Sequence, residues 1–574
     1  MTLEALSDVG SLGTNTTTVA EVTVNVEGGT RAGSLIPKPN DVQVNGGKDF
    51  VIGPGTRIVV DRTTAEQGEY LADLIAPATG FDLEVTSSKK ANGANSIRLK
   101  TVPAGTGSEQ GYRLTANRNH VDISASTPEG VFNGIQTLRQ LLPAQFAAKS
   151  KQNTLWNVQP VAISDSPRYD FRSAMLDVGR RYYPVADVKR YLDYMASYKL
   201  NAFHFHLTED QGWRIAIDAY PELTEIGGSG QSGIKPGTVD NGVAGPWFYS
   251  KDEYREIVDY ARARFIEVIP EIDGPGHAGA AMASIAGLNC NDISIPVYTS
   301  FDRGPNVCLK DTAHMNNVRD FLTTVIADIA GQTTTSEYIH LGGDESAGIT
   351  PEQFTEYTKI GNKAVSDAGK KVMGWNSWAS GEPLPEGAVL QNYGQEHSEL
   401  NLAADVKTAV ENGNQILMSP ADHTYLDIKY NASTPYGLTW VDGKYINLAR
   451  SYRWEPTTVV PDPDGEGRLE LSDENILGVE VALWADATNQ HGSHAPWTPT
   501  APFDPVSKYM DTMLFPRFPA VAEIAWSQRA DRQGDPTEFV DFQSRLVTHS
   551  AIWDAAGVGY DRAPDVPWGS KAQH

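Results

Sequence analysis

Positive charge and long apolar runs are scarce in this sequence, and each shortage excludes a class of function. There are 47 Lys and Arg residues against 72 Asp and Glu residues, which gives a formal net charge of −25, and no long basic run interrupts the acidity. Because such a chain would repel the phosphate backbone of a nucleic acid, nucleic acid is excluded as a partner. No stretch approaches the roughly 20 continuous apolar residues that a membrane-spanning helix needs, so we expect a soluble chain without membrane insertion.

Targeting signals and nucleotide-binding fingerprints are also missing. The N-terminus has no basic segment followed by an apolar one, and residues 1–33, rich in Thr, Gly, Val and Ser, predict a flexible leader or a processed N-terminus. Gly342 and Gly343 are not followed by Lys and then Ser or Thr, and no dinucleotide fingerprint opens a helix. We therefore expect no nucleotide cofactor.

Cysteine occurs only twice, as Cys290 and Cys308, in a segment that also contains Asn289, Pro296 and Pro305. These neighbours predict a loop, in which one local disulfide would fit and would stabilise the fold by about 3 kcal/mol in the chain-entropy model. Two free buried thiols are the alternative, because spacing alone does not establish a bond.

The composition that is present, with 40% apolar and 21% charged residues over 574 positions, predicts a globular protein of two or more domains. From 34 to 166, short alternating strands are separated by Pro and Gly turns, and a helix, GVFNGIQTLRQLLP, stands near the end. This range predicts a small α+β domain. From 167 to 574, apolar strands alternate with amphipathic helices, which is the pattern of stacked βα units.

Eight apolar strands follow one another in the second domain, which predicts a closed (β/α)8 TIM barrel. They begin at Arg172, Asn201, Glu267, Tyr338, Val372, Val389, Ile416 and Gly478. The helices between them show one apolar face, and two begin with capping-box patterns, at Ser250 with Glu253 and at Thr350 with Gln353. In such barrels the reacting groups lie at the C-terminal ends of the strands, so we look there for polar residues.

The fourth strand ends with two glycines and two adjacent carboxylates, Gly342-Gly343-Asp344-Glu345. Glycine lets the backbone approach a ligand closely. Neighbouring carboxylates in a partly desolvated pocket oppose each other's ionisation, which favours one protonated member that acts as a general acid on a glycosidic oxygen. A double-displacement glycosidase spaces its acid and nucleophile about 5–5.5 Å apart on opposite faces of the bond. Chain neighbours do not suit that spacing, so we expect the nucleophile elsewhere.

Several separated motifs resemble those of the β-N-acetylhexosaminidases of glycoside hydrolase family 20, of the actinobacterial type. Between about 170 and 527 these motifs are MLDVGRRYY, FHFHLTEDQGWR, EIDGPGH, HLGGDE and FPRFPAVAEIAWS. The segment GVFNGIQTLRQLLP resembles the end of that family's non-catalytic α+β domain, so the likeness covers most of the chain after residue 34. The family implies a retaining exo-glycosidase in which the substrate's own 2-acetamido oxygen attacks the anomeric carbon and forms an oxazolinium intermediate.

The resemblance implies a role for each matching residue at the centre of the site. Glu345 would protonate the leaving oxygen and later activate water, and Asp344 would orient the acetamido N–H and stabilise its developing charge. Tyr425 would hydrogen-bond the acetamido carbonyl. His277 and Glu209 would form a supporting pair behind the catalytic Glu, although His277 taken alone would more often be structural.

Two further side-chain groups have alternative interpretations. Arg180 would bind the hydroxyls of the terminal sugar through its planar fork, and a surface ion pair is its alternative. His204 and His206 face the same side of one strand, which suggests a metal site, but no Cys or third His stands at ligand spacing. We therefore predict hydrogen bonding inside the barrel and no metal.

Aromatic residues follow strands five to eight and resemble the family's acetamido pocket, because sugar C–H faces pack well against rings. For any single ring, a place in the core is an equally good interpretation. These residues are Trp375, Trp378, Tyr393, Tyr425, Trp440 and Trp484. The resemblance assigns substrate binding to Arg180, Trp375, Tyr393, Asp427, Trp440, Trp484 and Asp486.

The sequence departs from the family pattern at four positions. Glu209 stands where Asp is usual, so its role could pass to Asp210, and Arg181 stands where His is usual. Tyr393 replaces a Trp, and Asp486 replaces a Glu that contacts the 4- and 6-hydroxyls of the sugar. We therefore hypothesise retained chemistry with an altered preference at C4 or C6 of the sugar.

The sequence as a whole predicts an exo-acting hydrolase that releases terminal β-linked GlcNAc or GalNAc from oligosaccharides or glycans, without a metal or another cofactor. One alternative is an enzyme specialised for a disaccharide or for a 6-sulfated or otherwise substituted sugar. A second is a non-catalytic glycan-binding protein on the same fold, which the intact Glu345, Asp344 and Tyr425 disfavour. The substrate class, the acidic surface and the possible disulfide favour a secreted location.

Overall fold

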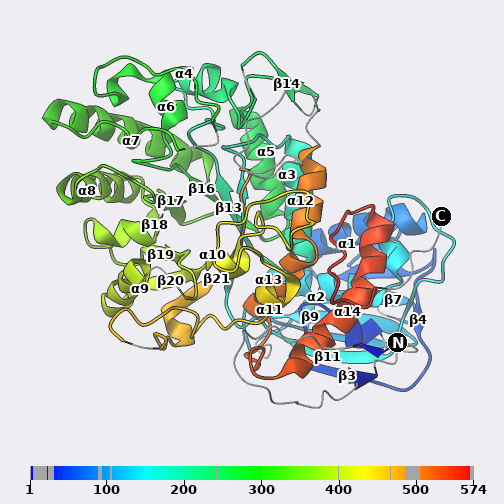
Figure 1. Cartoon of the computed structure of the whole chain (residues 1–574). Coiled ribbons are helices and arrows are strands. Elements are labelled where there is room, and N and C mark those ends of the chain that lie inside the picture. The colour runs from blue at the N-terminus through cyan, green and yellow to red at the C-terminus, as the bar shows by residue number, and fades with distance from the viewer. Residues whose placement is uncertain are drawn as a thin grey trace.

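The computed structural model contains an α+β domain followed by a closed barrel, which confirms the predicted fold class (Figure 1). The first domain contains a mixed sheet, and the second contains a closed ring of parallel strands. The residues that the structure describes are 2–3, 22–23, 31–87, 93–103, 107–234, 236–240, 242–300, 303–397, 400–465, 467–486 and 505–568.

The predicted leader, residues 1–33, lies mostly outside the described residues. Its short strands β1 (Thr2–Leu3) and β2 (Val22–Thr23) pair antiparallel. Arg31 already belongs to the folded domain, because its guanidinium donates to the carbonyl oxygen of Leu141 at 2.9 Å. The folded part of the chain therefore includes the last positions of the predicted leader.

The N-terminal domain is built on a seven-stranded sheet. Its strands are β3 (Asp41–Val44), β5 (Arg57–Val60), β6 (Val85–Thr86), β7 (Ser96–Thr101), β8 (Tyr112–Asn117), β9 (His120–Ala125) and β11 (Val161–Asp165), in the order β3-β11-β8-β9-β7-β5-β6. A separate pair joins β4 (Phe50–Val51) to β10 (Asn157–Val158). Every second side chain of β8 and β9 is buried, as expected for strands with one face on a core.

Two helices, α1 (Ala65–Thr79) and α2 (Pro128–Leu141), pack on this sheet. The Thr127 side chain caps α2 by accepting a hydrogen bond from the Gly130 N–H at 3.1 Å. Gly134 permits the close approach of α2 to the sheet, since a Cβ there would lie 2.4 Å from Ile123 Cγ2.

Eight parallel strands close into the barrel in sequence order, as predicted. They are β12 (Phe171–Asp177), β13 (Ala202–His206), β16 (Glu267–Glu271), β17 (Tyr338–His340), β18 (Lys371–Trp375), β19 (Val389–Asn392), β20 (Gln415–Met418) and β21 (Ile476–Leu483). The ring closes where β12 pairs with β21. Helices cover the outside of the barrel and side chains fill its inside, so β12 and β13 are buried along their whole lengths.

The outer helices confirm the patterns expected from the sequence. The main ones are α3 (Val185–Ser197), α5 (Lys251–Arg262), α7 (Thr312–Gln332), α8 (Pro351–Asp367), α9 (Leu400–Glu411), α12 (Val506–Leu514), α13 (Arg517–Trp526) and α14 (Pro536–Ala556). Shorter elements are α4 (Glu222–Glu225), α6 (Gly279–Ser284), α10 (Ala421–Thr424), α11 (Leu448–Tyr452) and the pair β14 (Val239–Asp240) and β15 (Val243–Ala244). Both capping boxes form, at Ser250 with Glu253 and at Thr350 with Gln353.

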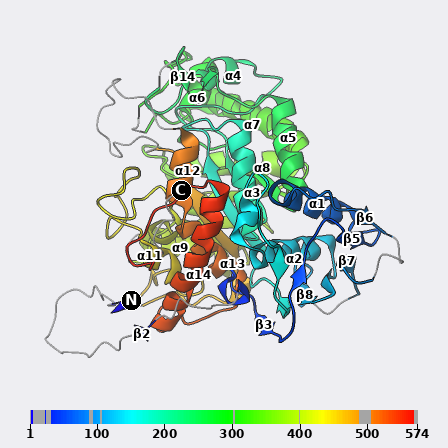
Figure 2. The same ribbon diagram turned by 90° about the vertical axis from the view of Figure 1, so that its right-hand side faces the viewer.

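The N-terminal domain contacts the barrel at the N-terminal ends of its strands. Lys199, just before β13, lies 3.1 Å from the buried carboxylate of Asp165. Arg172, at the start of β12, donates to Gln110 at 2.5 Å. Figures 1 and 2 show this domain to one side of the barrel, with α14 beside it. These contacts with the N-terminal domain therefore lie at the end of the barrel opposite to the C-terminal ends of its strands.

No helix among the described residues combines the length and the apolarity needed to cross a membrane.

Candidate active site

The carboxylate pair Asp344-Glu345 lies in a tight turn directly after β17. Gly342 and Gly343 have φ values of +64° and +104°, which favour glycine. A Cβ on Gly342 would lie 1.6 Å from Asp273 Oδ1, so no side chain fits there. Glu345 itself has a φ of +53°, a conformation that L residues rarely adopt and that is concentrated at functional sites.

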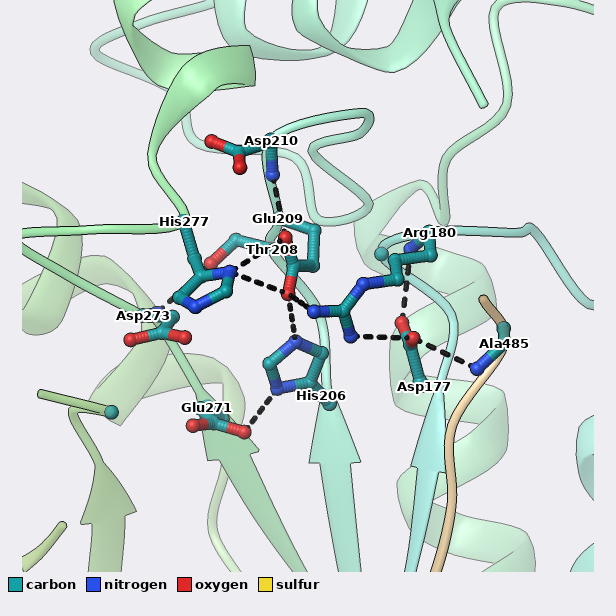
Figure 3. A network of polar contacts seen from close by, with 12 residues as sticks. Asp177, Arg180, His206, Thr208, Glu209, Asp210, Glu271, Asp273, His277 and Ala485 are labelled. Atoms are coloured by element: carbon teal, nitrogen blue, oxygen red, sulfur yellow. Dashed lines mark hydrogen bonds and ion pairs between the residues drawn. The ribbon is translucent and has the colours of Figure 1, made fainter. Parts of the chain in front are cut away.

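His277 lies between Glu345 and Glu209 in a chain of polar contacts, and Figure 3 shows its contact with Glu209. His277 Nε2 lies 3.4 Å from Glu345 Oε2, and His277 Nδ1 lies 3.1 Å from Glu209 Oε1. The Glu209 side chain is 1% exposed. The structure therefore brings together the three residues that the sequence analysis connected.

Asp210 has a different role from Glu209, although the sequence left the choice between them open. Its carboxylate accepts the backbone N–H of Gly279 at 2.9 Å and that of Gly304 at 2.6 Å. Glu209, in contrast, contacts the imidazole of His277 directly. Asp210 thus joins two loops of the barrel, and Glu209 is the partner of His277.

The charges of this chain favour an ion pair behind Glu345. Burial alone would raise the pKa of Glu209, but Arg180 and His277 outweigh burial and hold it well below its ordinary value. Burial would lower the pKa of His277, but the carboxylate of Glu209 outweighs it and raises this pKa well above the ordinary value. His277 is therefore an imidazolium beside Glu345 at neutral pH.

The pKa values of the two neighbouring carboxyl groups are shifted in opposite directions. The general acid Glu345 was expected to be the protonated member, but Asp344 is the one whose pKa is raised. Burial, aided by the charge of Glu345, raises the pKa of Asp344 to about 6. Burial also acts on Glu345, but His277 and Arg303 outweigh it and lower the pKa of this carboxyl. In the free protein Glu345 is thus ionised, and a proton must reach it before it can act as an acid.

Arg180, after β12, is surrounded by three carboxylates at the mouth of the barrel. Its Nη1 lies 3.0 Å from Asp177, its Nη2 2.6 Å from Glu209 and its Nε 3.1 Å from Asp486. The guanidinium also stands over the ring of Trp484 at 5.0 Å. The side chain is 12% exposed, so the alternative of a surface ion pair is wrong.

Five aromatic rings form a wall beside the carboxylate turn. Trp484 lies 5.8 Å from Trp375 and 5.7 Å from Tyr425, measured between ring centroids. Tyr393 meets Trp375 edge-on at 5.8 Å, and Trp440 meets Tyr425 at 6.0 Å. Trp440 is half exposed, whereas Trp375, Tyr425 and Trp484 are buried. The wall therefore extends from the barrel interior to solvent.

Trp378 does not belong to this wall, although the sequence grouped it there. Its ring is fully buried, its Nε1 donates to Asn362 at 2.9 Å, and it packs edge-on against Tyr357 at 6.0 Å. A Cβ on Gly343 would lie 2.7 Å from Trp378 Cε3. The ring packs between the carboxylate turn and α8, because both Asn362 and Tyr357 belong to that helix.

Two further predicted residues, Asp427 and Asp486, bring acidic groups close to each other and to Arg180. Asp427 is 1% exposed, and burial together with the charge of Asp486 raises its pKa to about 8. Burial also raises the pKa of Asp486, and the charge of Arg180 opposes that rise. Within the described part of the chain, Asp427 Oδ1, Asp344 Oδ1 and Trp484 Nε1 are buried without a hydrogen-bond partner. These atoms are available to the polar groups of a ligand.

Sequence reasoning missed several residues that hold the site together. Asp273 accepts the backbone N–H of Gly343 at 3.2 Å and so fixes the carboxylate turn. Asp177 accepts the backbone N–H of Ala485 at 3.0 Å, which joins the ends of β12 and β21. Arg303 forms an ion pair with Glu345. Asp177 and Asp273 stand at strand ends, a position that could have identified them, whereas Arg303 had no such signal.

The histidines on β13 lie inside the barrel in a hydrogen-bonded cluster. His204 lies 2.9 Å from Glu271 and 3.1 Å from Glu480, and His206 also contacts Glu271. Glu271 accepts the indole N–H of Trp375 at 2.9 Å as well. His204, Glu271 and His340 form a set of ligand-type atoms close enough to hold a metal ion, so the fold brings in a third His that the sequence spacing did not indicate. Their contacts follow the predicted interior hydrogen bonding.

Models of a known enzyme family match most of the chain. The catalytic domain of glycosyl hydrolase family 20 matches residues 169–360 and 349–529, and domain 2 of that family matches 32–166. A β-N-acetylhexosaminidase of Cellulomonas fimi is 33% identical over 542 residues, which are 93% of this chain and 97% of that protein.

Solved structures give the same result. The β-N-acetylhexosaminidase of Streptomyces coelicolor is 38% identical, with a TM-score of 0.81 over 94% of this chain and 99% of that one. The N-acetyl-β-hexosaminidase of Streptomyces plicatus, solved in complex with Thio-NAglucal, is 39% identical, with a TM-score of 0.81 over 94% and 98%. A mutant of the latter was solved with the product GlcNAc.

Proposed function

The chain belongs to glycosyl hydrolase family 20 and is an exo-acting enzyme of the β-N-acetylhexosaminidase class, and we propose that it uses its substrate's own acetamido group as the nucleophile. One observation carries this proposal. Asp344 and Glu345 project from one glycine turn beside the aromatic wall, and Asp344 Oδ1 is buried without a partner in the described chain. That oxygen would accept the acetamido N–H and position the carbonyl oxygen for attack.

The reaction then proceeds in two steps. The acetamido carbonyl oxygen attacks the anomeric carbon, the glycosidic C–O bond breaks, and Glu345 donates its proton to the departing oxygen. Asp344 stabilises the positive charge that develops on the oxazolinium nitrogen, and the Tyr425 hydroxyl would hydrogen-bond the acetamido oxygen. Water, deprotonated by Glu345, opens the ring on the face opposite to the first attack. The two inversions give net retention.

The imidazolium of His277 can supply the proton that Glu345 needs. In the free protein the positive charge lies on His277 and the negative charge on Glu345, 3.4 Å apart. A bound sugar excludes water from this pair, which disfavours separated charges and favours transfer of the proton to Glu345. Glu209 is ionised behind His277 and stabilises its imidazolium form. It therefore favours the return of a proton to His277 when the carboxylate of Glu345 forms again.

The first test is steady-state hydrolysis of 4-nitrophenyl β-GlcNAc and β-GalNAc, with and without GlcNAc-thiazoline and with EDTA as a metal control. We expect turnover that thiazoline inhibits and EDTA does not, because the thiazoline mimics the intermediate. Tight thiazoline binding without turnover on any substrate would instead identify a non-catalytic glycan-binding protein.

We propose that the acidic groups of Asp427 and Asp486 set the preference at C4 and C6 of the sugar. Asp486 is held by Arg180 at 3.1 Å, and Asp427 is protonated at neutral pH, so that it can both donate and accept. We infer that this pair binds the hydroxyls of GlcNAc and GalNAc alike. A 6-sulfate would meet the charges of Asp486 and Glu209, so 6-sulfated sugars would be poor substrates.

Asp486→Glu tests this preference. The longer carboxylate reaches closer to the 4-hydroxyl, so we expect kcat/KM for aryl GlcNAc over aryl GalNAc to rise by about tenfold, the equivalent of one hydrogen bond of ~1.4 kcal/mol. Asp252→Glu, on the exposed face of α5, is the control and should leave the ratio unchanged. An unchanged ratio in Asp486→Glu would remove Asp486 from sugar selection.

We also propose that the protein acts outside the cell on chitooligosaccharides or N-acetylhexosamine-bearing glycans. The support is the Cys290–Cys308 disulfide, since such bonds persist in oxidising compartments, together with the net charge of −25. Fractionation of the source cells, with alkylation and mass spectrometry of the two cysteines, tests this. Reduced thiols in a cytosolic fraction would contradict it.

A further inference from the structure

The Cys290–Cys308 disulfide closes a loop between the end of η5 (Ala286–Leu288) and the start of α7. We call residues 290–308 the disulfide loop. Its C-terminal part returns to the active site, where the Val307 N–H donates to the carbonyl of Pro275 at 2.9 Å. Asn306 Nδ2 donates to the carbonyl of Ala347 at 2.7 Å. The loop is thus attached to the segments that carry His277 and Glu345.

The peptide unit between Arg303 and Gly304 is held by hydrogen bonds at both its carbonyl oxygen and its N–H. Gly304 N–H donates to Asp210 Oδ2 at 2.6 Å, and a Cβ on Gly304 would lie 2.3 Å from Asp210 Oδ1. The hydroxyl of Tyr298 donates to the carbonyl of Arg303 at 2.9 Å. Asp210, next to the catalytic support Glu209, therefore sets where the side chain of Arg303 begins.

The Arg303 guanidinium stands on the solvent side of Glu345. It forms an ion pair with Glu345 Oε1, while its own side chain is 60% exposed and that of Glu345 is 35% exposed. The other charged groups that act on Glu345 are His277, Arg180 and the neighbouring Asp344, and their side chains are at most 16% exposed. Arg303 is thus the charged neighbour that faces the side from which a leaving group departs.

We propose that Arg303 is a positioning residue on the leaving-group side of the site, which holds the ionised carboxylate of Glu345 between turnovers and hydrogen-bonds the hydroxyls of the departing sugar during turnover. The inference rests on the proposed function. Arg suits this position because its planar fork presents five N–H donors, more than one carboxylate oxygen uses. A substrate that places its glycosidic oxygen against Glu345 must take over part of the guanidinium's contacts.

The same contact sets the proton balance of the acid. Arg303 stabilises the ionised form of Glu345 and so contributes to its lowered pKa, along with the larger contribution of His277. In the first step, the ion pair with Arg303 opposes protonation of Glu345. A leaving sugar that hydrogen-bonds Arg303 weakens this ion pair and so makes protonation easier. In the second step the carboxylate is the required base, and Arg303 again stabilises it. A leaving group without hydroxyls cannot form these hydrogen bonds to Arg303 and therefore does not weaken the ion pair.

The test compares two substrates in the full-length protein. One is N,N′-diacetylchitobiose, whose leaving group is a sugar, and the other is 4-nitrophenyl β-GlcNAc, whose leaving group has no hydroxyls. For Arg303→Met we expect kcat/KM on the disaccharide to fall by about tenfold more than on the aryl glycoside, the worth of one or two hydrogen bonds. Arg303→Lys keeps the charge without the fork, so it should keep the pH profile but lose most of the disaccharide preference.

The pH profile supplies the second readout. In the free enzyme the proton that the general acid will donate is held by the His277–Glu345 pair, so activity on the alkaline side is lost as pH rises through the pKa at which this pair loses that proton. Removing Arg303 raises that pKa, so the alkaline limb of kcat/KM should move to higher pH in Arg303→Met. The double variant Cys290→Ala/Cys308→Ala should move both readouts in the same direction but by less, because the hydrogen bond from Gly304 to Asp210 remains.

Arg255→Met, on the exposed surface of α5, is the matched control and should change neither readout. Equal losses on both substrates in Arg303→Met, with an unmoved alkaline limb, would show that Arg303 is only a surface ion pair. If the wild-type protein hydrolyses neither substrate, the proposed function fails instead, so the two failures are distinguishable.

Discussion

Asp344 and Glu345 are neighbours in the chain, yet the structure gives their carboxyl groups opposite surroundings. Asp344 is turned inward, and burial raises its pKa to about 6, whereas His277 and Arg303 stabilise the charge on Glu345. Under the proposed mechanism, Asp344 must be ionised to orient an amide, and Glu345 exchanges a proton with His277. Adjacent position in the sequence gives two roles because the turn directs the side chains to different places.

These roles predict different responses to leaving-group quality. Glu345→Gln cannot protonate the leaving oxygen, so we expect kcat/KM to fall by about 10²–10⁴-fold for a sugar leaving group and far less for 2,4-dinitrophenol, which leaves unaided. Asp344→Asn should fall strongly with both, because it acts on the ring-closing step. The measurement is steady-state kinetics over a series of aryl glycosides. Similar leaving-group slopes for the two variants would contradict the assignment.

Asp344 also predicts the acid limb of the pH profile. Its folded pKa, about 6, lies above the ordinary Asp value, and the reaction requires its ionised form. Activity should therefore be present above about pH 6 and decline as pH falls through this value. In Asp344→Asn the residual activity should lack that limb. A wild-type kcat/KM that stays constant down to pH 4.5 would show that Asp344 titrates elsewhere.

The single residues of the site divide into those that the sequence could indicate and those that it could not. Glu345, Asp344 and His277 stand in motifs at strand ends, and a pattern search finds them. The contact between Arg303 and Glu345 depends on a loop whose path is fixed by Asp210, and no local pattern encodes it. The sequence left open whether Trp378 belongs to the pocket or to the core, because the direction of its ring depends on packing against α8.

At the scale of elements, the turn after β17 depends on glycines that allow two close approaches. Gly342 permits contact with Asp273, and Gly343 permits contact with the ring of Trp378. The strands and helices around this turn were predictable, because apolar runs and capping boxes are local signals. The turn geometry was not, because it is set by Asp273 after β16 and by Trp378 after β18, which are distant in sequence from the turn.

Gly343→Ala tests the dependence of the site on this turn. The φ of +104° and a Cβ 2.7 Å from Trp378 Cε3 make the change unfavourable by about 1–3 kcal/mol of backbone strain in addition to the contact. We expect a lower Tm and a loss of kcat, because Asp344 and Glu345 would move together. Gly331→Ala, on α7 with no atom within 4 Å, is the control and should be neutral or slightly stabilising. A fully active Gly343→Ala would mean that the turn tolerates displacement.

At the scale of the whole molecule, a buried ion pair joins the two domains below the barrel. Glu523 on α13 lies 2.5 and 2.7 Å from the guanidinium of Arg545 on α14. Glu523 also accepts the backbone N–H of Lys38, and Arg545 donates to the carbonyl of Leu35, both at 3.0 Å. The pair thus ties the start of the N-terminal domain to two helices of the barrel, on the side away from the reacting groups.

Arg545→Met should therefore destabilise both domains together. It leaves the Glu523 carboxylate buried without its cation, which costs about 3–5 kcal/mol when one partner of a buried pair is removed. Calorimetry should show one transition at a lower Tm, and Arg545→Met/Glu523→Gln should recover part of the loss because no charge is left unpaired. Activity measured well below the Tm should be nearly unchanged, since Arg545 contacts none of the reacting residues described above. Two separate transitions would instead show that the N-terminal domain unfolds independently and that the ion pair does not couple the stability of the two domains.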